Sequence, residues 1–138
     1  MGQMELETVQ NLIISKFDAF WLTTPIEHVN SVIDKTKIDE WVRLSISHMP
    51  AKPFTFAMSS VRGGFVNIQI FTKMNIGQGR AIDLATKAGK FIQALSTGSL
   101  VMRPYDLTII GNKASNTLTT TEISWFQVNC IIEFTYID

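Results

Sequence analysis

The residues with the most reactive side chains are two histidines, His28 and His48, and one cysteine, Cys130. Imidazole and thiolate groups are common zinc ligands and common partners in nucleophilic catalysis. Here they lie far apart in the sequence and share no ligand spacing, and the chain has no G-x-S-x-G motif. Cys130 falls within an alternating apolar run, where a free cysteine is typically a small buried group. We therefore expect no metal site, no catalytic residue and no cofactor.

A glycine-containing segment, Gly77-Gln78-Gly79-Arg80, begins like the phosphate-binding loop of dinucleotide-binding proteins. Ile82 stands where that motif needs a third glycine, and Ser99 stands where its acidic residue is expected. The glycines therefore favour a loop and a helix entry, whose backbone amides could hold an anion as at any helix start. Binding of a small molecule through this loop remains the weaker alternative.

Arginine and aromatic side chains are better suited to contacting another protein, because both types are enriched at interfaces. Arg62 precedes a glycine pair, so it is either an interface residue or an exposed arginine at a strand start. Two tryptophans lie on the less apolar face of their strands, where they either contact a partner or pack under a helix. Our candidates for a subunit or partner interface are Trp41, Arg43, Arg62, Phe65, Arg80 and Trp125.

The run Thr120 to Ile137 must position several of these residues. Its even-numbered residues from Phe126 to Tyr136 are apolar and its odd-numbered residues are mixed, which predicts a strand with one core face. It is longer than the usual strand of a globular protein. It therefore either bends at a bulge or projects beyond the body as an arm, and a projecting apolar edge is a template for another chain.

The remaining patterns predict two amphipathic helices and several strands. The helices are Glu5–Phe20 and about Arg80–Leu95, the second ending at Gly98 as a left-handed terminator. Gly63-Gly64 suggests a bulge or sharp twist, and Pro104 favours an edge or bulged strand. The expected extended segments are Ile26–Asn30, Trp41–Met49, a weaker one at Phe54–Ser60, Val61–Thr72 and Leu100–Gly111, with turns at Pro50–Pro53 and Gly111–Thr119.

Strands joined by tight turns favour a mainly antiparallel arrangement. We predict an α+β fold in which residues 1–138 form a single two-layer domain. Its mixed, mainly antiparallel sheet has about four or five strands, and two helices cover one face.

Composition agrees with one folded domain and gives little electrostatic guidance. The 138 residues include 46% hydrophobic residues, and 12 basic residues balance 12 acidic ones. A net charge of zero implies no bulk attraction to nucleic acid and little protection against self-association. The single cysteine excludes an intrachain disulfide and fits a reducing compartment. We see no signal sequence or membrane-spanning run and expect no membrane association.

Several segments resemble, in order and spacing, the tail terminator-like proteins of long-tailed bacteriophages. They are Phe20–Asn30 (FWLTTPIEHVN), Glu40–Arg43 (EWVR), Arg62–Phe71 (RGGFVNIQIF) and Gly77–Gly79 (GQG) followed by a helix. The resemblance runs from about residue 5 to residue 137. The positions matching the family pattern are Thr24, Pro25, Asn30, Trp41, Arg62, Gly64, Gly77 and Gly79, and the family gives none of them a catalytic role.

The resemblance implies a structural virion protein rather than an enzyme. Such proteins form a hexameric ring on the head-proximal end of the tail tube, after assembly in the host bacterial cytoplasm. The ring stops tube polymerisation and gives the head connector or neck protein a docking surface, and DNA passes through its channel without sequence-specific binding. The expected partners are thus other copies of the chain, the tail tube protein and the head connector. A head–tail connector of similar build is the alternative.

Overall fold

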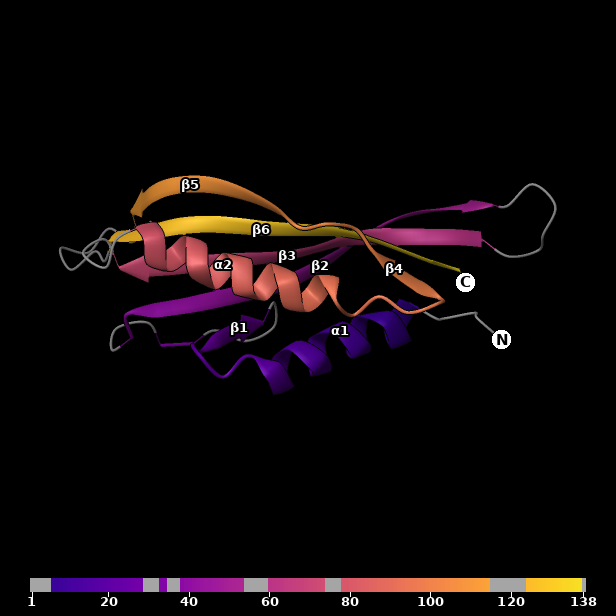
Figure 1. Ribbon diagram of the computed structural model, residues 1–138, viewed down its shortest axis with the longest axis horizontal. Helices are drawn as coiled ribbons and strands as arrows, with labels where there is room; N and C mark the ends of the chain where they lie inside the picture. The colour runs from indigo at the N-terminus through magenta and orange to yellow at the C-terminus, as the bar shows by residue number, and fades with distance from the viewer. Residues whose placement is uncertain are drawn as a thin grey trace.

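The computed structural model describes residues 6–28, 33–34, 38–53, 60–73, 78–114 and 124–137. These residues form an α+β fold with two helices and six strands (Figure 1). In chain order the elements are α1 (Leu6–Phe20), β1 (Ile26–His28), β2 (Glu40–Pro53), β3 (Ser60–Lys73), α2 (Gln78–Gln93), β4 (Leu100–Met102), β5 (Asp106–Ala114) and β6 (Ser124–Ile137).

The six strands form one mixed sheet, in the order β1-β2-β3-β6-β4, with β5 also paired to β6. Only β1 and β2 run parallel, and the other pairs are antiparallel. β6 lies in the interior of the sheet, with β3 on one side and both β4 and β5 on the other. The prediction that this strand supplies a projecting edge is therefore wrong for residues 124–137. The described ends of β2 and β3 reach past the helices instead (Figure 1).

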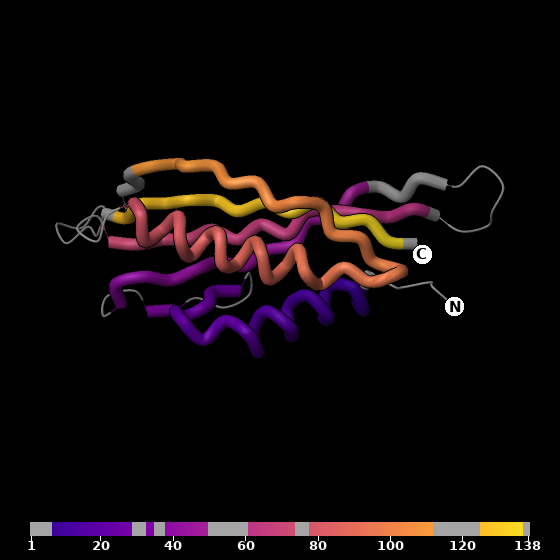
Figure 2. Tube along the Cα trace, in the orientation of Figure 1, coloured from indigo at the N-terminus to yellow at the C-terminus, as the bar shows by residue number. Residues whose placement is uncertain are grey.

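Both helices cover the same face of the sheet, as the predicted two-layer arrangement requires (Figure 2). The apolar stripe of α1 and that of α2 meet even-numbered residues of β2, β3 and β6 in one core. A central row of this core joins Val42, Ile70 and Val128, which are all fully buried. Each such aliphatic side chain contributes roughly 1.5–3 kcal/mol by leaving water, so this face supplies most of the stability.

The chain between α2 and β5 differs in detail from the prediction. Gly98 does not adopt a positive φ, and in the described residues only Gly111 does, at 88°. The turn after α2 is instead held by Thr97, whose N–H donates to Leu100 O at 2.7 Å and whose Oγ1 accepts from Leu100 N at 3.2 Å. Pro104 separates β4 from β5, and β5 carries a register shift between Ile109 and Gly111, so the predicted edge and bulge are both present.

Residues Pro50–Pro53 were predicted as a turn, but β2 continues through them. Its ladder with β3 shifts register between Met49 and Lys52, so the bulge lies on β2 and not at the glycine pair. Gly63 and Gly64 pair regularly instead, and glycine stands at both positions because the surroundings have no room for a side chain. A Cβ at Gly64 would overlap Ser47 O, and one at Gly63 would lie 2.5 Å from Phe134 O. The segment Phe54–Ser60 lies outside the described residues except for Ser60, which begins β3.

Candidate subunit or partner interface

The face of the sheet opposite the helices carries four of the six candidate interface residues. We call it the open face and define it by the odd-numbered residues 41–49 of β2, 63–73 of β3 and 125–135 of β6. Trp41, Arg43, Phe65 and Trp125 lie on it. Arg62 lies on the helix side at the register position of Tyr136, and Arg80 lies in the first turn of α2.

One end of the open face is closed by an aromatic cluster of Trp41, Phe71 and Trp125. Trp41 stacks on Phe71 with ring centroids 4.1 Å apart, and Trp125 meets Trp41 edge-on at 6.1 Å. Ile33 and Ile38 pack against these rings. The two tryptophans are only 3% and 6% exposed, so this cluster is a small second core that holds the open face together.

Arg43 sits beside the aromatic cluster in a polar network. Its Nε pairs with Glu27 Oε1 at 2.9 Å, and its Nη1 donates to Gln69 Oε1 at 3.2 Å. Its guanidinium also lies over the ring of Trp41, 5.2 Å from the centroid. Glu27 is 4% exposed, and a buried carboxylate needs both a counter-charge and hydrogen bonds. This network therefore fixes the short strand β1 on β2.

The other end of the open face is hollowed. Ser47, Phe65, Asn67 and Ile131, from β2, β3 and β6, line a shallow depression of about 310 Å³. The Oδ1 atom of Asn67 is buried there without a hydrogen-bond partner among the described residues. The depression has one aromatic wall, one aliphatic wall and polar edges. This part of the open face has room for a side chain of another molecule.

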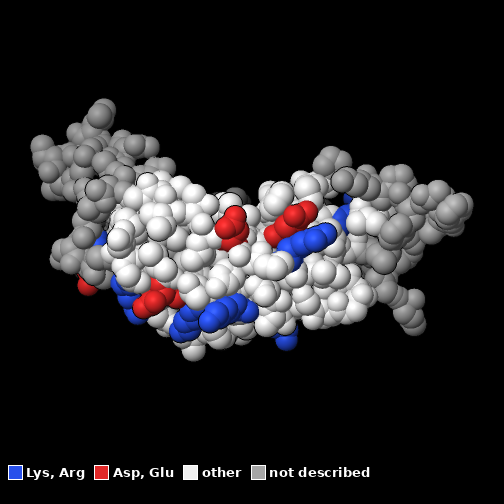
Figure 3. Space-filling view, turned by 45° about the horizontal axis from the view of Figure 1, so that its top comes forward, with Lys and Arg blue, Asp and Glu red and all other residues white. Residues whose placement is uncertain are grey.

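The face seen in Figure 3 carries no continuous basic patch of described residues. Seen with the β5 side brought forward, the described surface is mostly uncharged, with acidic and basic side chains interspersed (Figure 3). This agrees with the zero net charge of the whole chain.

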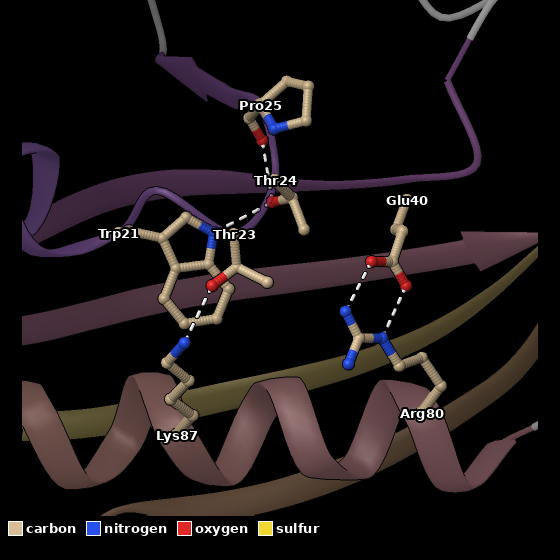
Figure 4. Close-up of polar contacts among 7 residues, drawn as sticks. All are labelled: Trp21, Thr23, Thr24, Pro25, Glu40, Arg80 and Lys87. Atoms are coloured by element: carbon tan, nitrogen blue, oxygen red, sulfur yellow. Dashed lines mark hydrogen bonds and ion pairs between the residues drawn. The ribbon is translucent and has the colours of Figure 1, made fainter.

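Arg80 forms a bidentate pair that links α2 to the start of β2. Its Nε and Nη2 donate to the two carboxylate oxygens of Glu40 at 2.8 and 2.7 Å (Figure 4). Hydrogen bonding to Glu40 raises the pKa of Arg80 above its ordinary value, so the guanidinium stays charged. This candidate interface residue thus already has a partner within the subunit. Gly77, which precedes the helix, lies outside the described residues.

The Thr-Thr-Pro segment of the resemblance forms the connection between α1 and β1. Trp21 Nε1 donates to Thr24 Oγ1 at 2.9 Å, and Thr24 Oγ1 donates to Pro25 O at 3.1 Å (Figure 4). Lys87 of α2 donates to Thr23 Oγ1 at 2.8 Å. These contacts tie the end of α1 to α2, which gives this segment a structural role.

The reactive residues are occupied or shielded. Cys130 is fully buried, as predicted, and burial together with the charge of Asp106 raises the pKa of its thiol to about 12. His48 meets Gln10 Oε1 at 3.1 Å, and His28 Nε2 lies 3.1 Å from Asp18 Oδ1. Within the described ranges, no three His, Cys, Asp or Glu side chains are grouped so as to hold a metal ion.

Sequence patterns gave the strand faces of Trp41, Arg43, Phe65 and Trp125, but not the contacts of these side chains. Glu27, Gln69 and Ser47 were not singled out, because a polar residue on a strand does not reveal which cross-strand neighbour it meets. The consecutive apolar pair Ile109 and Ile110 was also missed. Both residues are exposed on β5, at 55% and 45%, and two adjacent isoleucines in a strand weakened by Pro104 were the available signal.

Comparison with known proteins adds no family assignment. A scan against models of protein families matches none of them. A search of curated proteins likewise finds no match. None of the described helices is long and apolar enough to cross a membrane.

Proposed function

We propose that this chain is a structural virion protein of the tail terminator type. It would assemble as a ring, with six subunits by family analogy, on the head-proximal end of a phage tail tube. There it would stop tube growth and provide the surface on which the head connector docks. The protein would act by binding, with no catalytic step.

The order and spacing of the segments from Phe20 to Gly79 carry this proposal. Two features of the fold support it. The open face presents the depression lined by Phe65 and Ile131, which has room for a side chain of another molecule. The described ends of β2 and β3 also extend past the helix layer, where they could reach a neighbouring subunit (Figure 1).

Negative-stain microscopy of the purified protein mixed with its candidate tail tube protein tests the proposal. We expect tubes that carry a ring at one end and stop elongating. Tubes of uncontrolled length without rings would contradict it, and binding to the head portal complex instead would favour the connector alternative. Saturable binding of a nucleotide would favour the small-ligand alternative.

Variants in the depression sharpen this test. Ile131→Lys places a charge on the open face without touching the helix-covered core and should abolish capping. Leu22→Lys, at an apolar position that is 84% exposed and lies outside the depression, is the matched control and should cap tubes normally. Trp125 is a poor choice for such a test, because its burial in the aromatic cluster would confound loss of binding with loss of stability.

A further inference from the structure

The two edges of the sheet differ in how they are protected. At one edge the short strand β1 covers residues 42–44 of β2, and Pro50 and Pro53 further along β2 lack an N–H. At the other edge, β5 pairs only with β6 among the described strands, and no proline interrupts it. An edge strand that has no proline and exposes Ile109 and Ile110 is a template for another strand, provided that the partner accommodates its bulge.

The hydrogen bonds show which groups of β5 point away from the sheet. Arg103 N donates to Glu133 O, so the odd-numbered residues of β6 direct their backbone groups toward β4 and β5. Their register partners on β5 are Asp106, Thr108, Gly111 and Lys113. The backbone N–H and C=O groups of Leu107, Ile109 and Asn112 therefore point away from β6, because the backbone groups of alternate residues point to opposite edges of a strand. We call these the outward-facing residues of β5.

The bulge makes this edge self-complementary. We take Ile110 as the extra residue of the bulge and leave it out of the pairing. A second β5 can then lie antiparallel to the first, with a twofold axis between the two Ile109 residues. Leu107 then lies opposite Asn112 of the second copy, and both are outward-facing residues. Asp106 takes the register position opposite Lys113, so two residue types of opposite charge are paired at both ends.

We infer that two free copies of this protein pair through β5 to form a twofold dimer with one continuous sheet. The helices of both copies would lie on the same side of that sheet, and the two exposed Ile109 side chains would cover each other. A head-to-tail pairing of β5 with β2 is disfavoured, because β1 occupies the place beside residues 42–44 of β2 and Pro50 and Pro53 lack an N–H, which leaves only residues 45–49 between them. The inference concerns the free protein and does not depend on the proposed function.

A single cysteine near the twofold axis tests the geometry. Directly opposed, hydrogen-bonded residues in an antiparallel pair have Cα atoms about 5.5 Å apart, which suits a disulfide. Under mild oxidation, Ile109→Cys should give at least tenfold more covalent dimer than Leu22→Cys or Val101→Cys. Leu22 and Val101 are exposed apolar residues away from β5, at 84% and 50%, and serve as matched controls. Equal cross-linking of all three variants, or none at Ile109→Cys, would overturn the inference.

A charge exchange tests the register without a covalent bond. In sedimentation equilibrium, Asp106→Lys should weaken dimerisation on the order of tenfold, because it opposes like charges twice in one dimer. The double variant Asp106→Lys/Lys113→Asp should restore it. A double variant as weak as the single variant would contradict this register. Dimerisation with no tube capping would support this inference and reject the proposed function. Tube capping without dimerisation of the free protein would support the proposed function and reject this inference.

Discussion

The two faces of the sheet use the same three strands in different ways. On the helix-covered face, residues such as Val66, Ile68 and Ile132 are fully buried, and the buried side chains are mostly apolar. On the open face, their neighbours form a small aromatic cluster at one end and a hollow at the other, with the Arg43 network beside the cluster. One face therefore supplies stability, and the other combines local stability with surface that another protein can contact.

The largest expected effect separates the two faces at adjacent residues of β3. Ile68→Ala removes a fully buried side chain from the covered face and should lower the free energy of unfolding by about 2–5 kcal/mol. Asn67→Ala, one residue away on the open face, should change it by less than about 1 kcal/mol, because its Oδ1 has no described partner to lose. Urea denaturation of both variants checks the contrast, and equal losses would contradict it.

The ion pair on the open face should matter next. Arg43→Met removes the counter-charge of the buried Glu27 and should cost about 1–3 kcal/mol, below the value for a fully buried pair because Arg43 is partly exposed. The double variant Glu27→Gln/Arg43→Met should recover part of this loss. Lys73→Met, which breaks a pair with the largely exposed Asp39, should cost at most about 1 kcal/mol in the same denaturation series.

Cys130, on the helix-covered face, should make the free energy of unfolding depend on pH. Its thiol has an ordinary pKa of 9.0, raised to about 12 in the fold. As pH rises above 9.0 the unfolded chain releases this proton and the folded protein keeps it, so stability falls by about 1.4 kcal/mol per pH unit. Denaturation at pH 8 and pH 10 should show this drop in the wild type and a smaller drop in Cys130→Ala. Parallel curves would refute it.

Two glycines of α2 should respond with opposite signs. A Cβ at Gly89, which faces the core, would lie 2.6 Å from the Tyr105 ring and 2.9 Å from Cys130 Sγ. Gly89→Ala should therefore lower the melting temperature. The expected loss of unfolding free energy is about 1 kcal/mol, after the better helix propensity of alanine has been subtracted. A Cβ at Gly79 would meet no atom within 4 Å. Gly79→Ala should therefore raise the melting temperature, with a gain in unfolding free energy of up to about 1 kcal/mol. A higher melting temperature for both variants would contradict this contrast and show that Tyr105 and Cys130 move aside for the added methyl group.

Periodicity predicted the parts of the fold that rest on burial. The alternation in Phe126–Tyr136 gave the covered face of β6, and the apolar stripes gave both helices to within a few residues. Strand length left a bend and a projecting arm both open, because it says nothing about neighbours. Residues 124–137 do not form an arm, since β6 is flanked on both sides, and residues 115–123 before them lie outside the described part of the chain. Likewise, Trp41 and Trp125 were placed on the correct face. Their mutual contact depends on the register through β3, which no single segment encodes.

The central position of β6 affects how the chain can fold during synthesis. The hairpin of β2 and β3 and the helix α2 leave the ribosome well before β6 does, because chains emerge from the N-terminus at a few residues per second. Until β6 arrives, the inner edge of β3 has no partner, and β4 and β5 have no strand to join. The nascent protein would therefore carry an unpaired apolar strand edge from the synthesis of β3 until that of β6, and the sheet can be completed only when the last strand is available.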